Sequence, residues 1–355
     1  MDFETFKEKI AEDVKAECAE RGIGNVEITT AEVEKLNVSY SGMSVRREGE
    51  NIGLTLNLDH MYEAMQNGET YDAVKDKAMN SVEENIDSME VDVRNVTEYD
   101  QMKEKLSVEV VSLDANKDLL ERVPHKSMED LAIVYRLVLD TDDSSKGTIL
   151  VTNSLMNNYG ITPEQLHEDA MKNSPIIRPA NIRGMSEVMM ELMPRSEAEM
   201  LGLVKVDPAD EQIFVATVPD KIHGAGVIAY PNFLEEAAEK VGGSYFVLPS
   251  SLHEVLLVPE KTGMQTAELE AMVRDVNSTK VAPEDKLSDN VYHYDANEHI
   301  FELAENYEDR INGIEDRAEN SVLQDLKNTK DEISHQDAKE PIDKAVKKNR
   351  SEESL

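Results

Sequence analysis

The sequence predicts an α+β protein, with mixed antiparallel strands and packed helices in two lobes and a disordered C-terminal tail. Three observations support this prediction: apolar residues recur at helical spacing in some segments, they alternate in others, and both patterns fade after about residue 305. We expect an N-terminal lobe over 1–110, a second lobe over 111–304, and a mixed-charge tail over 305–355 that is partly helical or disordered.

The first element is predicted to be an amphipathic helix. Asp2 can cap it, Gly22 can end it, and its apolar face is formed by Phe3, Phe6, Ile10, Val14 and Cys18. Cys18 is therefore expected to be a core residue. Because it is the only cysteine, the chain cannot form an internal disulfide or a cysteine-based zinc site.

A half-buried strand is predicted where Ile52, Leu54, Leu56 and Leu58 alternate with polar residues. The preceding stretch, NVSYSGMSVRREGE, is expected to supply its antiparallel partner. Asp59 should cap a short helix, and a second helix should begin near Thr70. The acidic stretch from Val82 to Asp100 is expected to be a solvated helix end and loop.

The second lobe begins with two predicted strands, DLAIVYRLVLD and GTILVTN, joined by a turn over 142–147. Thr162 and Pro163 then start a helix, which Pro175 should end near Asn173. A Met-rich helix over 185–193 follows. Methionine suits both cores and interfaces, so the sequence leaves the role of this helix open.

The remaining segments of this lobe alternate between strands and helices. QIFVATV and GAGVIAY are predicted strands, and Pro231 opens a helix. SYFVL and LHEVLLVP should form a hairpin around Pro249, because proline marks a strand end. NVYHYD and HIFELA are the last two strands expected.

Charge excludes several classes of partner. The net charge is −36, from 73 acidic and 37 basic residues. Such a chain repels nucleic acids and anionic membranes, whose binding depends on lysine and arginine, so we expect neither as a direct partner. The N-terminus lacks a signal-peptide pattern, and no apolar run approaches the roughly 18 residues of a membrane span. The expected location is therefore the cytoplasm.

The stretch FVLPSSLHEVLLVPE raises the question of a nucleophile with its base. Ser250 or Ser251 could pair with His253 in a hydrolase, but catalysis would also need an oxyanion hole and an acid that orients the imidazole. The G-x-S-x-G elbow typical of hydrolases is absent. A hairpin with a hydrogen-bonded histidine is the preferred interpretation.

A second group of candidates lies in YHYDANEH, where His293, Asp295 and His299 could bind a metal if a hairpin brought them together. Their spacing matches no zinc pattern, and HExxH is absent. The phosphate-binding patterns GxxxxGK[ST] and GxGxxG are absent too, so no cofactor is expected. The glycines of HGAG, at His223 to Gly226, are interpreted as turn residues.

One segment runs against the overall charge. Between Ala170 and Ser186 there is no acid, whereas Lys172, Arg178 and Arg183 are basic. This segment could bind an anion or an acidic protein partner, including a second copy of the chain. The alternative is that its charges pair with nearby acids of the same molecule.

The chain resembles a family from gut Clostridia known as domain of unknown function 5688. The resemblance covers roughly residues 1–300 and rests on MDFETFKEKIAEDV, NIGLTLNLDHMYE, YRLVLD, GTILVTNSLMNNYGITPEQLHEDAMKNSP, FVLPSSLHEVLLVPE and PEDKLSDNVYHYD. It implies a bacterial cytoplasmic origin and a mobile-element context, since members are often encoded beside mobile-element genes. It implies no activity, cofactor or catalytic residue. The middle segments also look like a distant Bacillus-type family with a similar strand–helix–strand order.

The expected function is that of a non-enzymatic interaction or regulatory protein, such as an accessory of a mobile genetic element. Two alternatives stay open. The first is a hydrolase that uses Ser251 and His253. The second is a DNA mimic that occupies a nucleic-acid-binding protein through its acidic surface.

Overall fold

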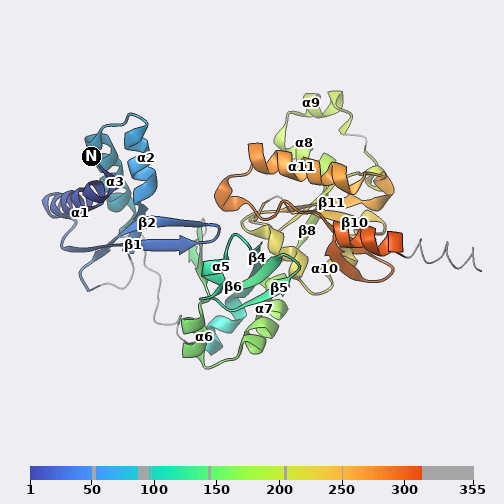
Figure 1. The fold of residues 1–355 in the computed structure, drawn as a ribbon, viewed down its shortest axis with the longest axis horizontal. Coiled ribbons are helices and arrows are strands. Elements are labelled where there is room, and N and C mark those ends of the chain that lie inside the picture. Colours follow the sequence, from blue (N-terminus) through green and yellow to red (C-terminus); the bar gives the residue numbers. More distant parts are fainter. Residues whose placement is uncertain are drawn as a thin grey trace, which may run out of the picture. The chain divides into compact units, whose positions relative to one another are not determined.

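The computed structural model describes residues 1–49, 53–86, 96, 98–142, 145–203, 206–249 and 251–313. Met1–Ala304 form one compact unit and Glu305–Leu355 a second. The first unit contains three antiparallel sheets with packed helices, which confirms the α+β fold class (Figure 1). In the second unit, residues 305–313 are helical. The rest of the predicted tail, most of the acidic stretch 82–100, Ile52 and the centre of the turn over 142–147 lie outside the described residues.

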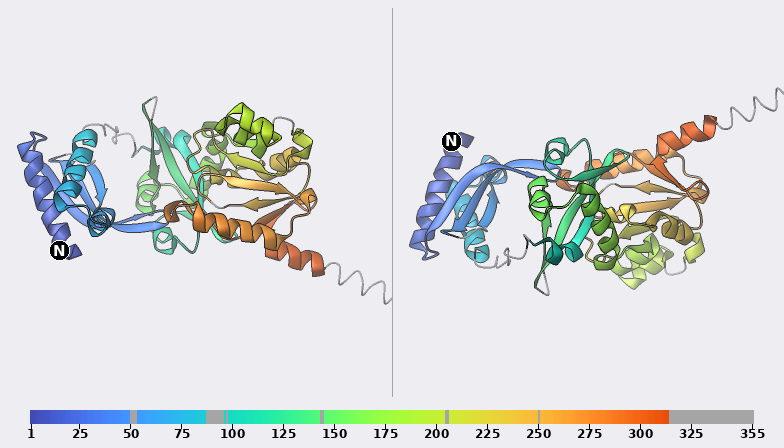
Figure 2. Two further views of the ribbon diagram at one scale, coloured as in Figure 1. Left: turned by 90° about the horizontal axis from the view of Figure 1, so that it is seen from above. Right: turned by 90° about the horizontal axis from the view of Figure 1, so that it is seen from below.

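The N-terminal sheet has the order β1-β2-β3 and carries three helices (Figure 2). Its elements are α1 (Phe3–Glu20), β1 (Val26–Lys35), β2 (Val38–Arg47), β3 (Gly53–Asn57), α2 (Leu58–Gln66) and α3 (Tyr71–Asn85). The predicted cap of α1 is confirmed, because the Asp2 carboxylate accepts a hydrogen bond from the Thr5 N–H at 2.8 Å. Helix α3 begins next to Thr70, as predicted, and the Thr70 side chain caps it by accepting from the Ala73 N–H.

The predicted cap of α2 is wrong. Asn57 caps this helix, accepting a hydrogen bond from the His60 N–H at 3.0 Å. Asp59 lies inside the helix, and its carboxylate accepts from the Ser41 N–H of β2 at 3.1 Å. Strand β1 was not predicted. Its apolar residues Val26, Ile28 and Val33 do not keep one alternation along the strand, and its centre is exposed.

The turn between β1 and β2 contributes to a second hydrophobic core. Leu36 is buried in the apolar cluster formed mainly by the later strands. Asn37 has a left-handed backbone (φ 62°), and its N–H donates to Asn116 Oδ1 at 2.7 Å. Its side-chain amide donates to the carbonyls of Glu284 (2.9 Å) and Lys286 (2.7 Å). The first core, by contrast, is formed among the described residues by side chains between Phe3 and Ile86.

The second sheet has the order β4-β6-β5, with β7 paired to the far part of β6. It is built from β4 (Leu106–Ser112), β5 (His125–Met128), β6 (Leu131–Asp142) and β7 (Ser145–Leu150). The helices around it are α4 (Tyr99–Met102), η1 (Lys103–Lys105), α5 (Lys117–Leu120), α6 (Asn153–Tyr159) and α7 (Pro163–Ile177).

The third sheet has the order β13-β12-β10-β11-β9-β8, and Figure 2 shows α11 along one of its faces. Its strands are β8 (Asn181–Gly184), β9 (Phe214–Thr217), β10 (Tyr245–Leu248), β11 (Val255–Pro259), β12 (Tyr292–Asp295) and β13 (Ile300–Leu303). Its helices are α8 (Met185–Leu192), α9 (Arg195–Met200), η3 (Pro208–Asp210), η4 (Gly224–Ala229), α10 (Phe233–Val241), η5 (Glu260–Thr262), α11 (Thr266–Thr279) and η6 (Pro283–Asp285). Both predicted hairpins, β10–β11 and β12–β13, are confirmed.

Two predictions in this region are wrong. Helix α7 does not stop near Asn173 but continues through Pro175 to Ile177. The Ser174 hydroxyl bonds to the Ala170 carbonyl at 2.6 Å, while Arg178 N–H still bonds to the Ser174 carbonyl, so the last turn is held despite the proline. GAGVIAY forms the 3₁₀ helix η4 rather than a strand, and η4 packs against both β4 and β9.

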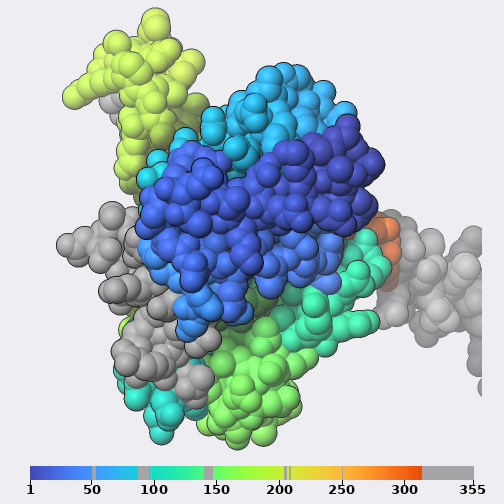
Figure 3. Space-filling model, turned by 90° about the vertical axis from the view of Figure 1, so that its left-hand side faces the viewer, coloured from blue at the N-terminus to red at the C-terminus, as the bar shows by residue number. Residues whose placement is uncertain are grey.

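The Met-rich helix is a surface element. In α8 only Ser186 is buried. Leu192 and Met200, in α8 and α9, are 77% and 82% exposed. Figure 3 shows this part of the chain, in yellow-green, projecting at the surface. We call the exposed apolar side chains of this segment the α8–α9 surface: Met190, Leu192, Met200, Leu201 and Val206.

Two glycines allow η4 to approach its neighbours closely. A Cβ atom on Gly224 would lie 2.1 Å from Thr217 Oγ1 and 2.5 Å from the His253 carbonyl oxygen. A Cβ atom on Gly226 would lie 2.9 Å from the Val108 carbonyl oxygen of β4. Each glycine thus approaches at least one backbone atom, which cannot move aside as easily as the end of a flexible side chain.

We expect Gly224→Ala to destabilise the protein by about 1–3 kcal/mol, because the added methyl group overpacks this contact. Urea denaturation followed by circular dichroism would measure the change. The matched control is Gly313→Ala, at a helical glycine where an added Cβ meets no atom within 4 Å. Equal stabilities for the two variants would contradict the close-packing argument.

Candidate functional site: a buried carboxylate with two histidines

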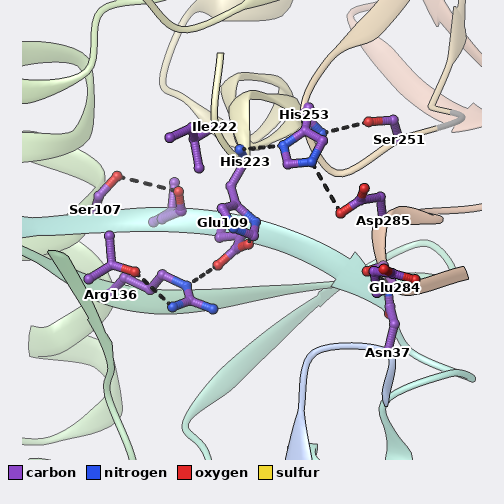
Figure 4. Close-up of polar contacts among 12 residues, drawn as sticks. Asn37, Ser107, Glu109, Arg136, Ile222, His223, Ser251, His253, Glu284 and Asp285 are labelled. Carbon is purple, nitrogen blue, oxygen red and sulfur yellow. Dashed lines mark hydrogen bonds and ion pairs between the residues drawn. The ribbon is translucent and has the colours of Figure 1, made fainter. Parts of the chain in front are cut away.

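Glu109 is a charged residue in a core strand, with a side chain only 1% exposed. It lies near the middle of β4, whose residues from Leu106 to Val111 are all buried. The guanidinium of Arg136, on the neighbouring strand β6, contacts Oε2, and Nδ1 of His223 contacts Oε1. Arg136 also donates to the Thr148 hydroxyl of β7 at 3.0 Å. The carboxylate therefore connects β4, β6 and the segment before η4 (Figure 4).

The charge of Glu109 is retained in this environment. Burial acts to raise the pKa of the carboxyl group, but the bond to His223 and the positive charge of Arg136 outweigh it and hold the pKa below its usual range. An isolated carboxylate in an apolar interior would take up a proton instead. The ion pair with Arg136 thus keeps a full negative charge directly behind an imidazole ring.

His223 is held in an uncommon backbone conformation. Its φ is 51°, in the left-handed region, and its N–H donates to Nδ1 of His253 at 3.1 Å. The two imidazole centroids lie 5.4 Å apart. The His223 side chain is 24% exposed, so its ring extends from the buried carboxylate to the solvent.

His253 is positioned from both sides of its ring. Its Nδ1 accepts from His223, so the ring proton is on Nε2, which lies 3.1 Å from Asp285 Oδ1. Its backbone N–H donates to the Ser251 hydroxyl at 2.9 Å, and its carbonyl accepts from the Thr217 hydroxyl at 2.7 Å. These contacts make His253 a support for the backbone of His223.

The predicted Ser–His pair is thus adjacent but not arranged as a nucleophile and its base. Ser251 bonds to the main chain of His253, whereas both ring nitrogens of His253 have other partners. A base in such a pair must accept the serine proton with a ring nitrogen. The other candidate serine, Ser250, lies outside the described residues.

The three predicted basic residues do not form one cluster. Lys172 is exposed on α7. Arg178 is buried, donates to Asp220 Oδ1 at 2.8 Å and contacts the carbonyl oxygen of Ile222. Arg183 pairs with Glu191 at 2.5 Å and Glu187 at 3.6 Å on α8. The second and third charges are therefore paired within the molecule, and Arg178 anchors the segment that leads to His223.

The structure does not bring the three predicted metal ligands together. His293 is buried in β12, with Nε2 3.6 Å from Glu260 Oε2. The Asp295 carboxylate accepts from the N–H groups of Asn297 and Glu298, and the exposed His299 lies 3.2 Å from the Tyr294 hydroxyl. No group of three or more possible metal ligands occurs among the described residues.

Sequence reasoning missed Glu109, Arg136 and His223. The available signal was weak, because Glu109 stands in SVEVVS, where alternation with valine is typical of a strand with a solvent-facing side. The HGAG stretch did mark the position of His223, but its glycines have an ordinary conformational explanation. Only the fold shows that the glycines bring η4 onto β4.

We expect Glu109→Gln to destabilise the protein by about 3–5 kcal/mol, because it leaves the Arg136 guanidinium without its buried partner. Thermal and urea unfolding would measure the loss. Glu104→Gln changes an exposed acid close to the same strand and should stay within about 0.5 kcal/mol of wild type. A Glu109→Gln variant as stable as this control would show that the ion pair contributes nothing.

We also expect His293 to make the fold sensitive to acid. Burial lowers its pKa, although Glu260 and Asp295 act in the opposite direction. The unfolded chain therefore takes up a proton below about pH 6.5, while the folded chain does so only at lower pH. Stability should fall in that window, by up to about 1.4 kcal/mol per pH unit. The stabilising contribution of neutral His293 is fully present above about pH 6.5.

The measurement is urea unfolding at pH 7.5, 6.0 and 5.0. His293→Asn should show a flatter pH dependence than wild type, whereas the exposed His299→Asn should follow wild type. Parallel curves for wild type and His293→Asn would refute this assignment.

Comparisons with known proteins place the chain in a family without assigning an activity. No curated protein and no solved structure matches it. No helix in the described ranges is long and apolar enough to cross a membrane. The family profile described as a family of unknown function (DUF5688) matches residues 3–296. The chain therefore belongs to the DUF5688 family.

Proposed function

We propose that this protein is an interaction protein that binds a basic protein partner through the α8–α9 surface. The observation that carries the proposal is the exposure of large apolar side chains on two consecutive helices, with Leu192 and Met200 mostly in solvent. Large apolar side chains that cluster on a solvent-exposed surface are typical of interaction sites. Methionine adapts its shape to a partner, which suits such a surface.

Charge supports a basic partner. Residues 183–210 contain six acids and three bases, and the chain carries a net charge of −36. Glu187, Glu191 and Glu199 lie beside the apolar residues with more than half of each side chain exposed. A partner with an apolar face and basic flanks would bury the apolar residues of this surface and attract its glutamates. A second copy of the chain would instead be repelled by its own charge.

The experiment is a pull-down from lysate of the source bacterium with quantitative mass spectrometry, at low and moderate salt. The Leu192→Asp/Met200→Asp variant should lose the captured partner, because two charges would have to be desolvated in the contact. Each central contact contributes about 2 kcal/mol, so the loss of affinity should exceed 100-fold. Binding by wild type should weaken as salt rises.

The matched control is Met272→Asp/Val276→Asp, at two partly exposed apolar residues on α11. This variant should retain the partner. Circular dichroism of both variants would confirm that they are folded. The proposal fails if both variants capture the same proteins as wild type, or if the proteins lost by Leu192→Asp/Met200→Asp are acidic.

A further inference from the structure

Beyond that proposed function, we propose that Glu109 and His223 form a general-base site in which His223 activates water for attack on small carboxylic esters. This inference does not depend on the α8–α9 surface. It rests on the contact between a buried carboxylate and one nitrogen of a partly exposed imidazole.

The contact fixes the proton of the ring. Nδ1 of His223 lies in close contact with Glu109 Oε1, and an ionised carboxylate oxygen repels the lone pair of an unprotonated ring nitrogen, so Nδ1 must carry the proton. In the neutral ring the lone pair is then on Nε2. No residue in the described part of the chain hydrogen-bonds to Nε2, and the side chain reaches the solvent. His223 is thus in the tautomer that a general base requires.

The backbone around His223 is fixed on both sides. Before it, the Arg178 side chain contacts the carbonyl of Ile222 and bonds to Asp220. At His223 itself, the N–H is bound by His253, and after it the Ala225 N–H donates to the Leu252 carbonyl at 3.0 Å. His253 is therefore a positioning residue for His223. Such fixation lowers the cost of bringing a base to its substrate.

The arrangement includes two features that are unfavourable for stability, which is a second reason to infer a function for it. It combines a buried ion pair with a non-glycine residue in the left-handed region. Hydrophobic residues in place of the ion pair are often equally stable or more stable, and backbone strain of this kind gathers at functional sites. Ile222, which precedes the histidine and is 48% exposed, offers an apolar contact for an ester.

The reaction balances without a cofactor. His223 Nε2 takes a proton from water as the water oxygen bonds to the carbonyl carbon of the ester. The negative charge of Glu109 stabilises the imidazolium that forms. The tetrahedral intermediate then breaks its bond to the leaving oxygen, which takes the proton from Nε2. The products are a carboxylic acid and an alcohol, and His223 returns to its starting form.

The test is hydrolysis of p-nitrophenyl acetate by the full-length protein. His223→Gln should lower kcat/KM by about 100-fold, the contribution of a positioned general base. His299→Gln removes an imidazole that is 64% exposed and lies outside this site, so it should remain within about twofold of wild type. Equal rates for wild type and His223→Gln would overturn the proposal.

A second measurement does not require a variant to fold. Nitrogen-15 NMR of the wild-type imidazoles at pH 8 should show His223 protonated on Nδ1 and His253 protonated on Nε2. The opposite tautomer at His223 would place the proton on the solvent-facing nitrogen and would also overturn the proposal. Loss of a pull-down partner leaves both readouts unchanged, so this inference and the proposed function fail separately.

Discussion

The contact on which most of the second core depends is the pairing of the Glu109 carboxylate with Arg136 and His223. It connects two neighbouring strands to the segment before η4, and η4 in turn packs against two sheets. Because a buried charge is tolerated only with its partners in place, each of these elements constrains the others. The missing side chains of Gly224 and Gly226 make the same approach sterically possible.

The parts of the fold that the sequence predicts well are those decided by local chemistry. Asp2 and Thr162 each cap the helix that follows, because the bond from cap to backbone spans only a few residues. The wrong predictions of secondary structure arise where contacts with residues distant in sequence determine the local conformation. Pro175 is accommodated through the hydroxyl of Ser174, and GAGVIAY becomes a 3₁₀ helix because two sheets enclose it.

The same difference between local signals and distant contacts explains why the sequence predicted only part of the candidate site. The sequence marks Ser251 and His253 as candidates, but the partners of His253, Asp285 and the His223 backbone, come from other segments. Glu109 could not be identified because a strand with alternating valines does not reveal that both of its faces are covered. Spacing along the chain locates caps and turns, whereas convergence of such residues is a property of the folded topology.

The turn at Leu36 and Asn37 has a consequence for biosynthesis. It leaves the ribosome early, with its own sheet and helices, yet its hydrogen-bond partners include the carbonyls of Glu284 and Lys286. Until that late segment is translated, Leu36 and the amide of Asn37 lack part of their native surroundings. Contacts of such long sequence separation slow folding and leave apolar surface exposed in the meantime. The tip of this hairpin therefore completes its native contacts only after the segment around residues 284–286 has been synthesised and has folded back onto it.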